Sequence, residues 1–90
     1  MTVGIPDISI IIVNWNVRDF LQKCLASIYN YTQGIKFEVW VVDNNSSDAS
    51  CAMVREMFPQ VNLISNQVNL GFAAANNLAL KECQAEFLLS

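Results

Sequence analysis

The stretch "VWVVDNNSSD", residues 39–48, changes within one residue from an apolar run to six small polar side chains. Valine and tryptophan are enriched in strands, whereas Asp, Asn and Ser favour turns and helix starts. We therefore predict a strand over 37–43 and a helix over 46–58, with Ser46 or Ser47 as its cap and Pro59 after its end. Taken alone the polar run is more simply structural, but a plain turn needs only two or three such residues.

Similar alternations of strand and helix precede and follow this stretch. The β-branched run "ISIIIV", residues 8–13, does not alternate with polar residues, which is typical of a central parallel strand buried on both faces. Apolar residues recur at helical spacing over 17–28, with Asn16 as the expected N-cap. A short strand is expected over 61–65. A helix over 71–83 and the beginning of a fourth strand over 85–90 follow it.

The predicted order β-α-β-α-β-α-β implies an α/β fold in three layers, with a mainly parallel sheet covered by helices. Right-handed crossovers leave few topologies, and we expect the strand order 3-2-1-4. This order is that of the first, Rossmann-like half of a doubly wound nucleotide-binding fold.

Composition limits the class of protein. The chain of 90 residues is 53% hydrophobic and 14% charged, which indicates either a deeply buried sheet or a part of something larger. Its net charge is −3, and its five basic residues are scattered, so no nucleic-acid partner is expected. Three cysteines without a C-x-x-C spacing and no histidine argue against a zinc site and a disulfide framework. We expect reduced thiols, no signal peptide and a cytoplasmic location.

Amide-rich segments follow the first three predicted strands: Asn14-Trp15-Asn16, Asp43-Asn44-Asn45-Ser46 and 66–71. In such sheets ligands bind outside the carboxyl ends of the strands, so we expect the three segments to face a shared cleft. The glycine patterns of NAD-binding and P-loop proteins are missing. A nucleotide held by carboxylate and amide groups remains, with Asp43 accepting a hydrogen bond from the imide N–H of uracil or thymine.

Three motifs carry a resemblance to a known family: "ISIIIVNWN", "VWVVDNNSSD" and "NQVNLGFAAANN". In this order they resemble the N-terminal nucleotide-binding part of family 2 glycosyltransferases of the GT-A fold. The resemblance covers 7–90, and we take 1–90 as this part of the domain. Trp15 and the Gly71-Phe72 pair are similar to the rhamnosyltransferase-like branch.

The resemblance implies roles for residues of the nucleotide-sugar site. Val13 and Asn14 would border the base pocket, with Asn16 on the same rim. Asp43 would bind the base imide, and Asn45 and Ser46 would support its loop. Asn69 and Gly71 would shape the wall near the ribose and diphosphate. Asn76 stands where many members carry an arginine, which places a basic contact to the donor phosphate in doubt.

The family's metal motif would follow Ser90, so the resemblance implies a chain truncated before the ligands of Mg²⁺ or Mn²⁺ and without catalytic residues. The whole enzyme would be an inverting glycosyltransferase that transfers a sugar from UDP or dTDP to an acceptor hydroxyl in cell-surface polysaccharide synthesis. It could be peripheral to a membrane, and the fragment is expected to be inactive and to self-associate. The alternatives are a non-catalytic nucleotide-binding or assembly module and, less well supported, a nucleotidyltransferase.

Overall fold

The computed structural model describes residues 5–83 and 87–89. Strands and helices alternate along the chain, as the sequence predicts. Their bounds are β1 Ile8–Asn14, α1 Arg18–Tyr31, β2 Phe37–Asp43, α2 Ser50–Met57, β3 Asn62–Ser65, α3 Phe72–Glu82 and β4 Phe87–Leu89. The remainder of the predicted fourth strand, at 85, 86 and 90, lies outside the described residues.

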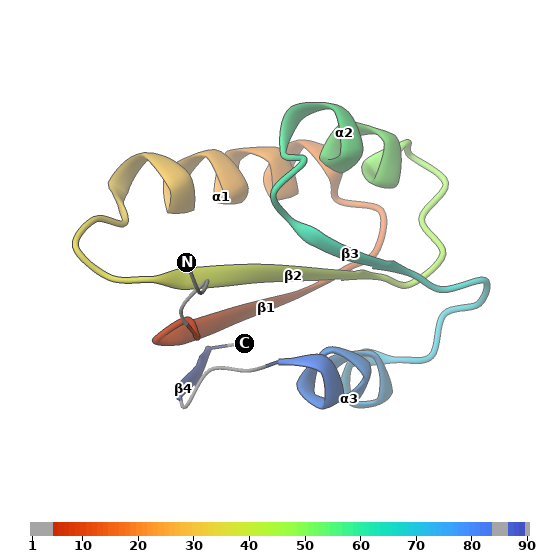
Figure 1. The fold of residues 1–90 in the computed structure, drawn as a ribbon. Helices are drawn as coiled ribbons and strands as arrows, with labels where there is room; N and C mark the ends of the chain where they lie inside the picture. The colour runs from red at the N-terminus through yellow and green to blue at the C-terminus, as the bar shows by residue number, and fades with distance from the viewer. Residues whose placement is uncertain (1–4, 84–86, 90) are drawn as a thin grey trace.

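The strands form one parallel sheet in which their order is β3-β2-β1-β4. β1 and β2 pair over their full length, and the register ends with Asn14 opposite Asp43. β3 joins β2 so that Asp43 also lies opposite Ser65. β4 pairs only with residues 8–10 at the other end of β1. The carboxyl ends of β1, β2 and β3 therefore meet at one edge of the sheet (Figure 1).

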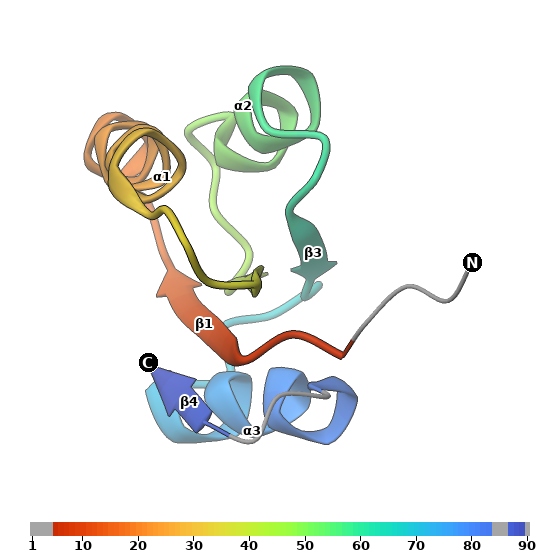
Figure 2. The ribbon, with the colours of Figure 1, turned by 60° about the vertical axis from the view of Figure 1, so that its left-hand side comes forward.

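Helices cover both faces of the sheet: α1 and α2 lie over one face and α3 over the other (Figure 2). Under α1 and α2 the core is built on Leu25, Val39 and Val41, each with 0% of its surface exposed. Burying one such side chain fully is worth about 1.5–3 kcal/mol. On the other face, Ala75 and Ala79 of α3 pack against the sheet. The α/β class and the three layers predicted from the sequence are confirmed.

β1 is less evenly covered than its apolar sequence predicts. Ser9 and Ile11 are buried on the α3 side, but Ile10 and Ile12 on the α1 side are only half-buried. A hollow of about 520 Å³ opens there between β1 and α1, and its lining includes Phe20. On the opposite face the small side chains of Ala75 and Ala79 are fully buried against the sheet.

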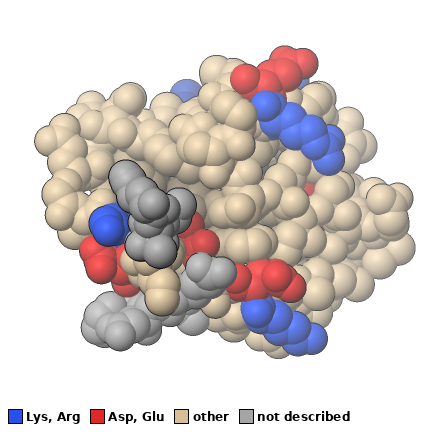
Figure 3. Space-filling view, in the orientation of Figure 1, with Lys and Arg blue, Asp and Glu red and all other residues tan. Residues whose placement is uncertain are grey.

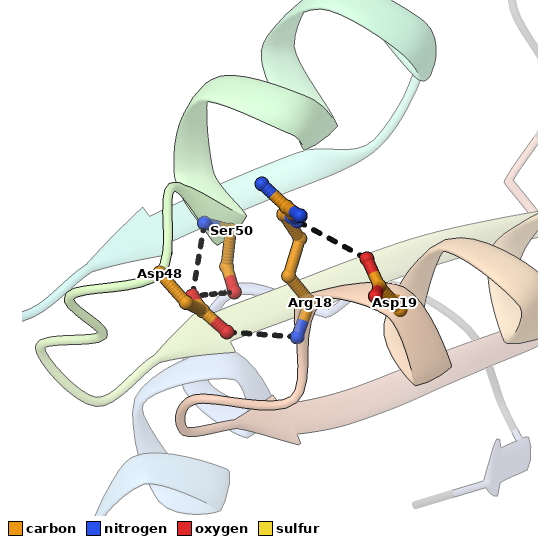
Figure 4. Close-up of polar contacts among 4 residues, drawn as sticks. All are labelled: Arg18, Asp19, Asp48 and Ser50. Atoms are coloured by element: carbon orange, nitrogen blue, oxygen red, sulfur yellow. Dashed lines mark hydrogen bonds and ion pairs between the residues drawn. The ribbon is translucent and has the colours of Figure 1, made fainter.

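Both α1 and α2 begin later than predicted. Neither Asn16 nor a serine at 46 or 47 caps them, because α1 starts at Arg18 and α2 at Ser50. Instead the carboxylate of Asp48 accepts the backbone N–H of Arg18 at 2.8 Å and that of Ser50 at 3.1 Å (Figure 4). One acidic side chain thus lies at the N-termini of two helices, where the helix dipoles favour negative charge.

The visible surface in Figure 3 is mostly uncharged, and its acidic and basic side chains lie side by side in a few small groups. This agrees with the low share of charged residues, 14%, and with the net charge of −3. In the part of the chain that the structure describes, none of the helices has the length and apolar character needed to cross a membrane.

Candidate functional site

Asp43, the last residue of β2, is the centre of the polar rim at the carboxyl ends of the strands. Its side chain is only 1% exposed. Its Oδ1 accepts hydrogen bonds from Asn14 Nδ2 at 2.8 Å and from the Ser46 hydroxyl at 2.7 Å. Its Oδ2 accepts the backbone N–H of Ser46 at 2.8 Å. The pairing of β1 with β2 positions Asn14, and the turn after β2 positions Ser46.

Ser46 joins this carboxylate to the loop after β1. Besides donating to Asp43, its hydroxyl oxygen accepts Asn14 Nδ2 at 3.2 Å and the backbone N–H of Asn16 at 2.9 Å. One donor and two acceptor positions are all that a hydroxyl offers. The Ser46 side chain is therefore fully occupied by contacts within the chain.

Asn16 forms the next link between the two loops. It has a φ of 54°, and its Oδ1 accepts the backbone N–H of Ser47 at 2.8 Å. Asn tolerates the left-handed region better than most residues, and here its side chain also holds the neighbouring loop. With the Asp48 contact to the first residue of α1, hydrogen bonds join Asn16 and Arg18 on one side to Ser46, Ser47 and Asp48 on the other.

Asp48 is a charged member of this arrangement. Burial disfavours its charged form, but hydrogen bonds from the Ser50 hydroxyl and from the N–H groups of Arg18 and Ser50 outweigh that effect and hold the pKa of Asp48 below its ordinary value. Arg18 itself pairs with the adjacent Asp19 at 3.2 Å (Figure 4). Asp48 therefore has a structural use in this chain.

Asn44 was not among the predicted site residues. Its side chain points away from the loop after β1 and toward the loop before α3. It is 2% exposed, and its Nδ2 donates to the carbonyl oxygen of Gly71 at 3.1 Å. Its Oδ1 accepts from Asn66 Nδ2 at 3.1 Å and from the backbone N–H of Leu70 at 3.3 Å. The sequence contains one signal for this direction. Asn44 directly follows Asp43, and successive side chains along a strand point to opposite faces, so Asn44 should point away from the side that Asp43 faces.

The segment 66–71 contains two of the predicted ligand residues. Asn69 is exposed, and its Oδ1 accepts the backbone N–H of Gly71 at 2.8 Å. Gly71 has a φ of 81° and a ψ of 171°, a conformation that is almost restricted to glycine. Apart from Gly71 itself and its two chain neighbours, no heavy atom lies within 4 Å of the position that a Cβ at Gly71 would take, so the backbone and not crowding requires glycine here.

The other predicted site residues enter none of these hydrogen bonds. Val13 is half-buried on β1, and Asn45 is exposed with a φ of 67°. Asn76 is half-buried on α3, and its Oδ1 is buried without a hydrogen-bond partner. Trp15 on the same rim is 56% exposed.

The expectation that the whole segment Asp43-Asn44-Asn45-Ser46 faces a shared cleft is wrong. Asp43 and Asn44 are buried, and the hydroxyl of Ser46 is occupied. An ionised carboxylate has about four acceptor positions, and the three hydrogen bonds to Asp43 leave one of them, on Oδ2. The thiol of Cys51 donates to the Ser65 hydroxyl at 3.6 Å. Burial raises the pKa of its thiol, and the negative charge of Asp43 raises it further.

A divalent metal is not supported by the described residues. Within 5–83 and 87–89, no group of three or more acidic or cysteine side chains could hold a metal ion. The chemistry of the rim is that of amides, hydroxyls and one buried carboxylate. It suits hydrogen bonding to a neutral, planar group better than chelation.

Several glycosyltransferases are similar in sequence to this chain. The chain is 29% identical over 92 residues to the glycosyltransferase AglE of Haloferax volcanii, covering 98% of this chain and 30% of AglE. It is 34% identical over 84 residues to the glycosyltransferase GlyA of Streptococcus pneumoniae, covering 90% of this chain and 12% of GlyA. A poly(ribitol-phosphate) beta-glucosyltransferase of Bacillus spizizenii is 32% identical over 87 residues, covering 91% of this chain and 14% of that enzyme. The chain thus spans less than a third of these relatives.

A solved structure has the same fold. The mannosyltransferase PcManGT from Pyrobaculum calidifontis, in complex with GDP-Man and Mn²⁺, superposes with a TM-score of 0.73 at 30% sequence identity. The match covers 89% of this chain and 25% of the mannosyltransferase. The likeness extends the identification from sequence motifs to the arrangement of strands and helices.

The model of the family described as "Glycosyl transferase family 2" matches residues 9–90, which include the sheet, its three helices and the rim centred on Asp43. The sequence match and the structural likeness agree on the GT-A fold of these enzymes. This chain therefore belongs to glycosyl transferase family 2.

Proposed function

We propose that this chain is the nucleotide-sugar-binding part of an inverting glycosyltransferase that uses a UDP- or dTDP-sugar. The observation that carries the proposal is the Asp43 carboxylate, held at the end of β2 with one acceptor position left. It lies on the rim where parallel α/β sheets bind ligands. The mannosyltransferase with the same fold binds a nucleotide sugar, which supports this class of ligand.

The number of free positions on Asp43 favours one kind of base. Uracil and thymine present one imide N–H, which fits a single acceptor. Guanine presents an N–H and an adjacent amino group, and a carboxylate binds both only when each of its oxygens has a free position. Here Oδ1 already accepts two hydrogen bonds.

The remaining residues of the chain would orient the donor. The hydrogen bonds of Asn14 and Ser46 keep the Asp43 carboxylate in place, so binding would not have to order it. Exposed Asn69 and the glycine backbone at 71 would lie beside the ribose and diphosphate. Mg²⁺ or Mn²⁺ would supply charge stabilisation of the leaving diphosphate, but the described residues do not fit a metal, so its ligands would come from elsewhere in the enzyme.

Finer assignments follow from the sequence motifs. Trp15 and the Gly71-Phe72 pair support a rhamnosyltransferase-like branch, and cell-surface polysaccharide synthesis is the proposed setting. The similarity to a poly(ribitol-phosphate) beta-glucosyltransferase is in keeping with that setting. Transfer to an acceptor hydroxyl is proposed for the whole enzyme, because the relatives are more than three times as long as this chain.

Calorimetric titration with a panel of nucleoside diphosphates tests the proposal. UDP and dTDP should bind more tightly than GDP. CDP should bind more weakly than UDP, because its base offers an acceptor where uracil has the imide N–H. Losing one hydrogen bond to a charged group costs about 1.5–3 kcal/mol, which corresponds to about 10- to 150-fold in affinity. Equal binding of UDP and CDP would exclude Asp43 as the base-binding residue.

The observation that Asp43 and Ser46 are occupied within the chain favours a second candidate, a rim that serves only to hold the loops together. This structural role predicts no measurable binding of UDP, dTDP or GDP by the folded chain. Saturable binding of any one of them, absent for free phosphate, would exclude it.

A further inference from the structure

Asn44 joins the base-binding end of the rim to the loop that precedes α3. Its backbone N–H donates to the carbonyl oxygen of Asn14 at 2.9 Å, beside Asp43. Its side chain holds the backbone of Leu70 and Gly71 on the opposite side. It is the most deeply buried amide of the loop after β2, with 2% exposure, and both acceptor positions and one of the two donors of its side chain are used.

Few contacts other than those of Asn44 join the loop 66–71 to the end of β2. Its apolar side chains face solvent: Val68 is 58% exposed and Leu70 is 44% exposed. Apart from the contacts of Asn44, one hydrogen bond in the described part of the chain joins the loop to the end of β2. In it the Asn66 N–H donates to the Asp43 carbonyl oxygen at 2.9 Å. Because burial contributes so little here, the position of the loop against the end of β2 depends on the Asn44 side chain.

We propose that Asn44 is a positioning residue for the diphosphate half of the nucleotide site. It places Asn69 and the glycine backbone at 71 beside the donor without touching the donor, and Asp43 binds the base independently of it. This inference rests on the proposed nucleotide-binding function. It predicts that losing Asn44 weakens recognition of the diphosphate and spares recognition of the base.

Asn44→Ala is the main test, applied to the chain described here. Titrations with uridine and with UDP, followed by NMR, give two dissociation constants. The uridine constant divided by the UDP constant measures how much the diphosphate adds to the affinity. We expect Asn44→Ala to reduce that ratio about 10-fold, as for the loss of one or two hydrogen bonds, while the uridine constant changes by less than about threefold. The Leu70 amide, which donates to Asn44 Oδ1, should exchange its hydrogen faster in the variant.

Two further variants control for a general loss of stability. Asn62→Ala deletes an amide that donates to the Val39 carbonyl oxygen at 3.3 Å, on β3 and away from the loop, and should leave the ratio unchanged. Asn44→Asp keeps an acceptor for the Leu70 N–H but sets a buried carboxylate oxygen against the Gly71 carbonyl oxygen, so it should reduce the ratio at least as much as alanine does. If Asn44→Ala does not fold, Asn44→Asp alone carries the comparison.

The outcomes separate this inference from the proposed function. A folded Asn44→Ala whose ratio stays within twofold of the unchanged chain overturns the positioning role, and so does an equal loss of uridine and UDP affinity. If the unchanged chain binds neither compound, the proposed function fails and the positioning role fails with it.

Discussion

Replacing Asp43 with Ala should destabilise the fold as well as weaken nucleotide binding. The substitution removes the acceptor for Asn14 Nδ2, the Ser46 hydroxyl and the Ser46 N–H. Asn14 is completely buried, so its amide cannot turn to water, although it keeps the contact to Ser46 at 3.2 Å. A hydrogen bond to a charged group contributes about 1.5–3 kcal/mol, and such bonds to one acceptor are not additive. We therefore expect Asp43→Ala to lower the free energy of unfolding by about 2–4 kcal/mol.

Urea unfolding followed by tryptophan fluorescence measures this change, because Trp40 lies on β2 and Trp15 lies on the rim. Asn45→Gly is the matched control in the same loop. Asn45 has a φ of 67° and makes none of the rim's hydrogen bonds, and glycine adopts positive φ without strain. The control should change the unfolding free energy by less than about 0.5 kcal/mol.

A decrease of less than about 1 kcal/mol for Asp43→Ala would refute this reasoning, because it would mean that solvent already reaches the three donors. A comparable loss in Asn45→Gly would show that the loop is sensitive to any substitution, and the effect could not then be assigned to the carboxylate.

Three further predictions concern single groups. Because the pKa of Asp48 is lowered in the folded chain, its stabilising effect is present above the ordinary Asp pKa of about 3.9 and is lost as the pH falls through the folded value. Urea unfolding between pH 7 and pH 3 should therefore show a steeper loss for the unchanged chain than for Asp48→Asn, and parallel curves would contradict this. Gly71→Ala should cost about 1–3 kcal/mol through backbone strain alone, measured in the same unfolding assay, and a neutral effect would show that the loop adopts another conformation. Burial raises the pKa of the Cys51 and Cys83 thiols, so mass spectrometry should show both alkylated more slowly than a free thiol at pH 8, and reaction at the free-thiol rate would be the contrary result.

Sequence patterns were sufficient for the class of fold because they report local and periodic properties. The apolar run ending at Asp43 and the polar residues after it predicted β2 with its observed bounds, Phe37–Asp43. The three motifs identified the family, which the family match over 9–90 confirms. The rhamnosyltransferase-like branch and the sugar depend on contacts outside this pattern and stay predictions.

The beginnings of the helices could not be found in this way. Asn16, Ser46 and Ser47 have the side chains of N-cap residues, and propensity alone favours them. In the folded chain the Asn16 N–H donates to the Ser46 hydroxyl oxygen, 30 residues away in sequence. The Asp48 carboxylate accepts the N–H groups of Arg18 and Ser50 at the two helix starts. The competing interactions are tertiary, so a local pattern does not contain them.

The sequence by itself determined the alternation of strands and helices, the parallel sheet and the family, because hydrophobic periodicity and short motifs are properties of neighbouring residues. Only the tertiary structure decided what the polar residues at the end of β2 and after it do. Pairing of β1 with β2 turns Asp43 inward against Asn14, and the twist of the following turn sends Asn44 toward Gly71. Direction and burial of a side chain in a turn depend on the segments that pack beside it, and those segments are brought there by the fold.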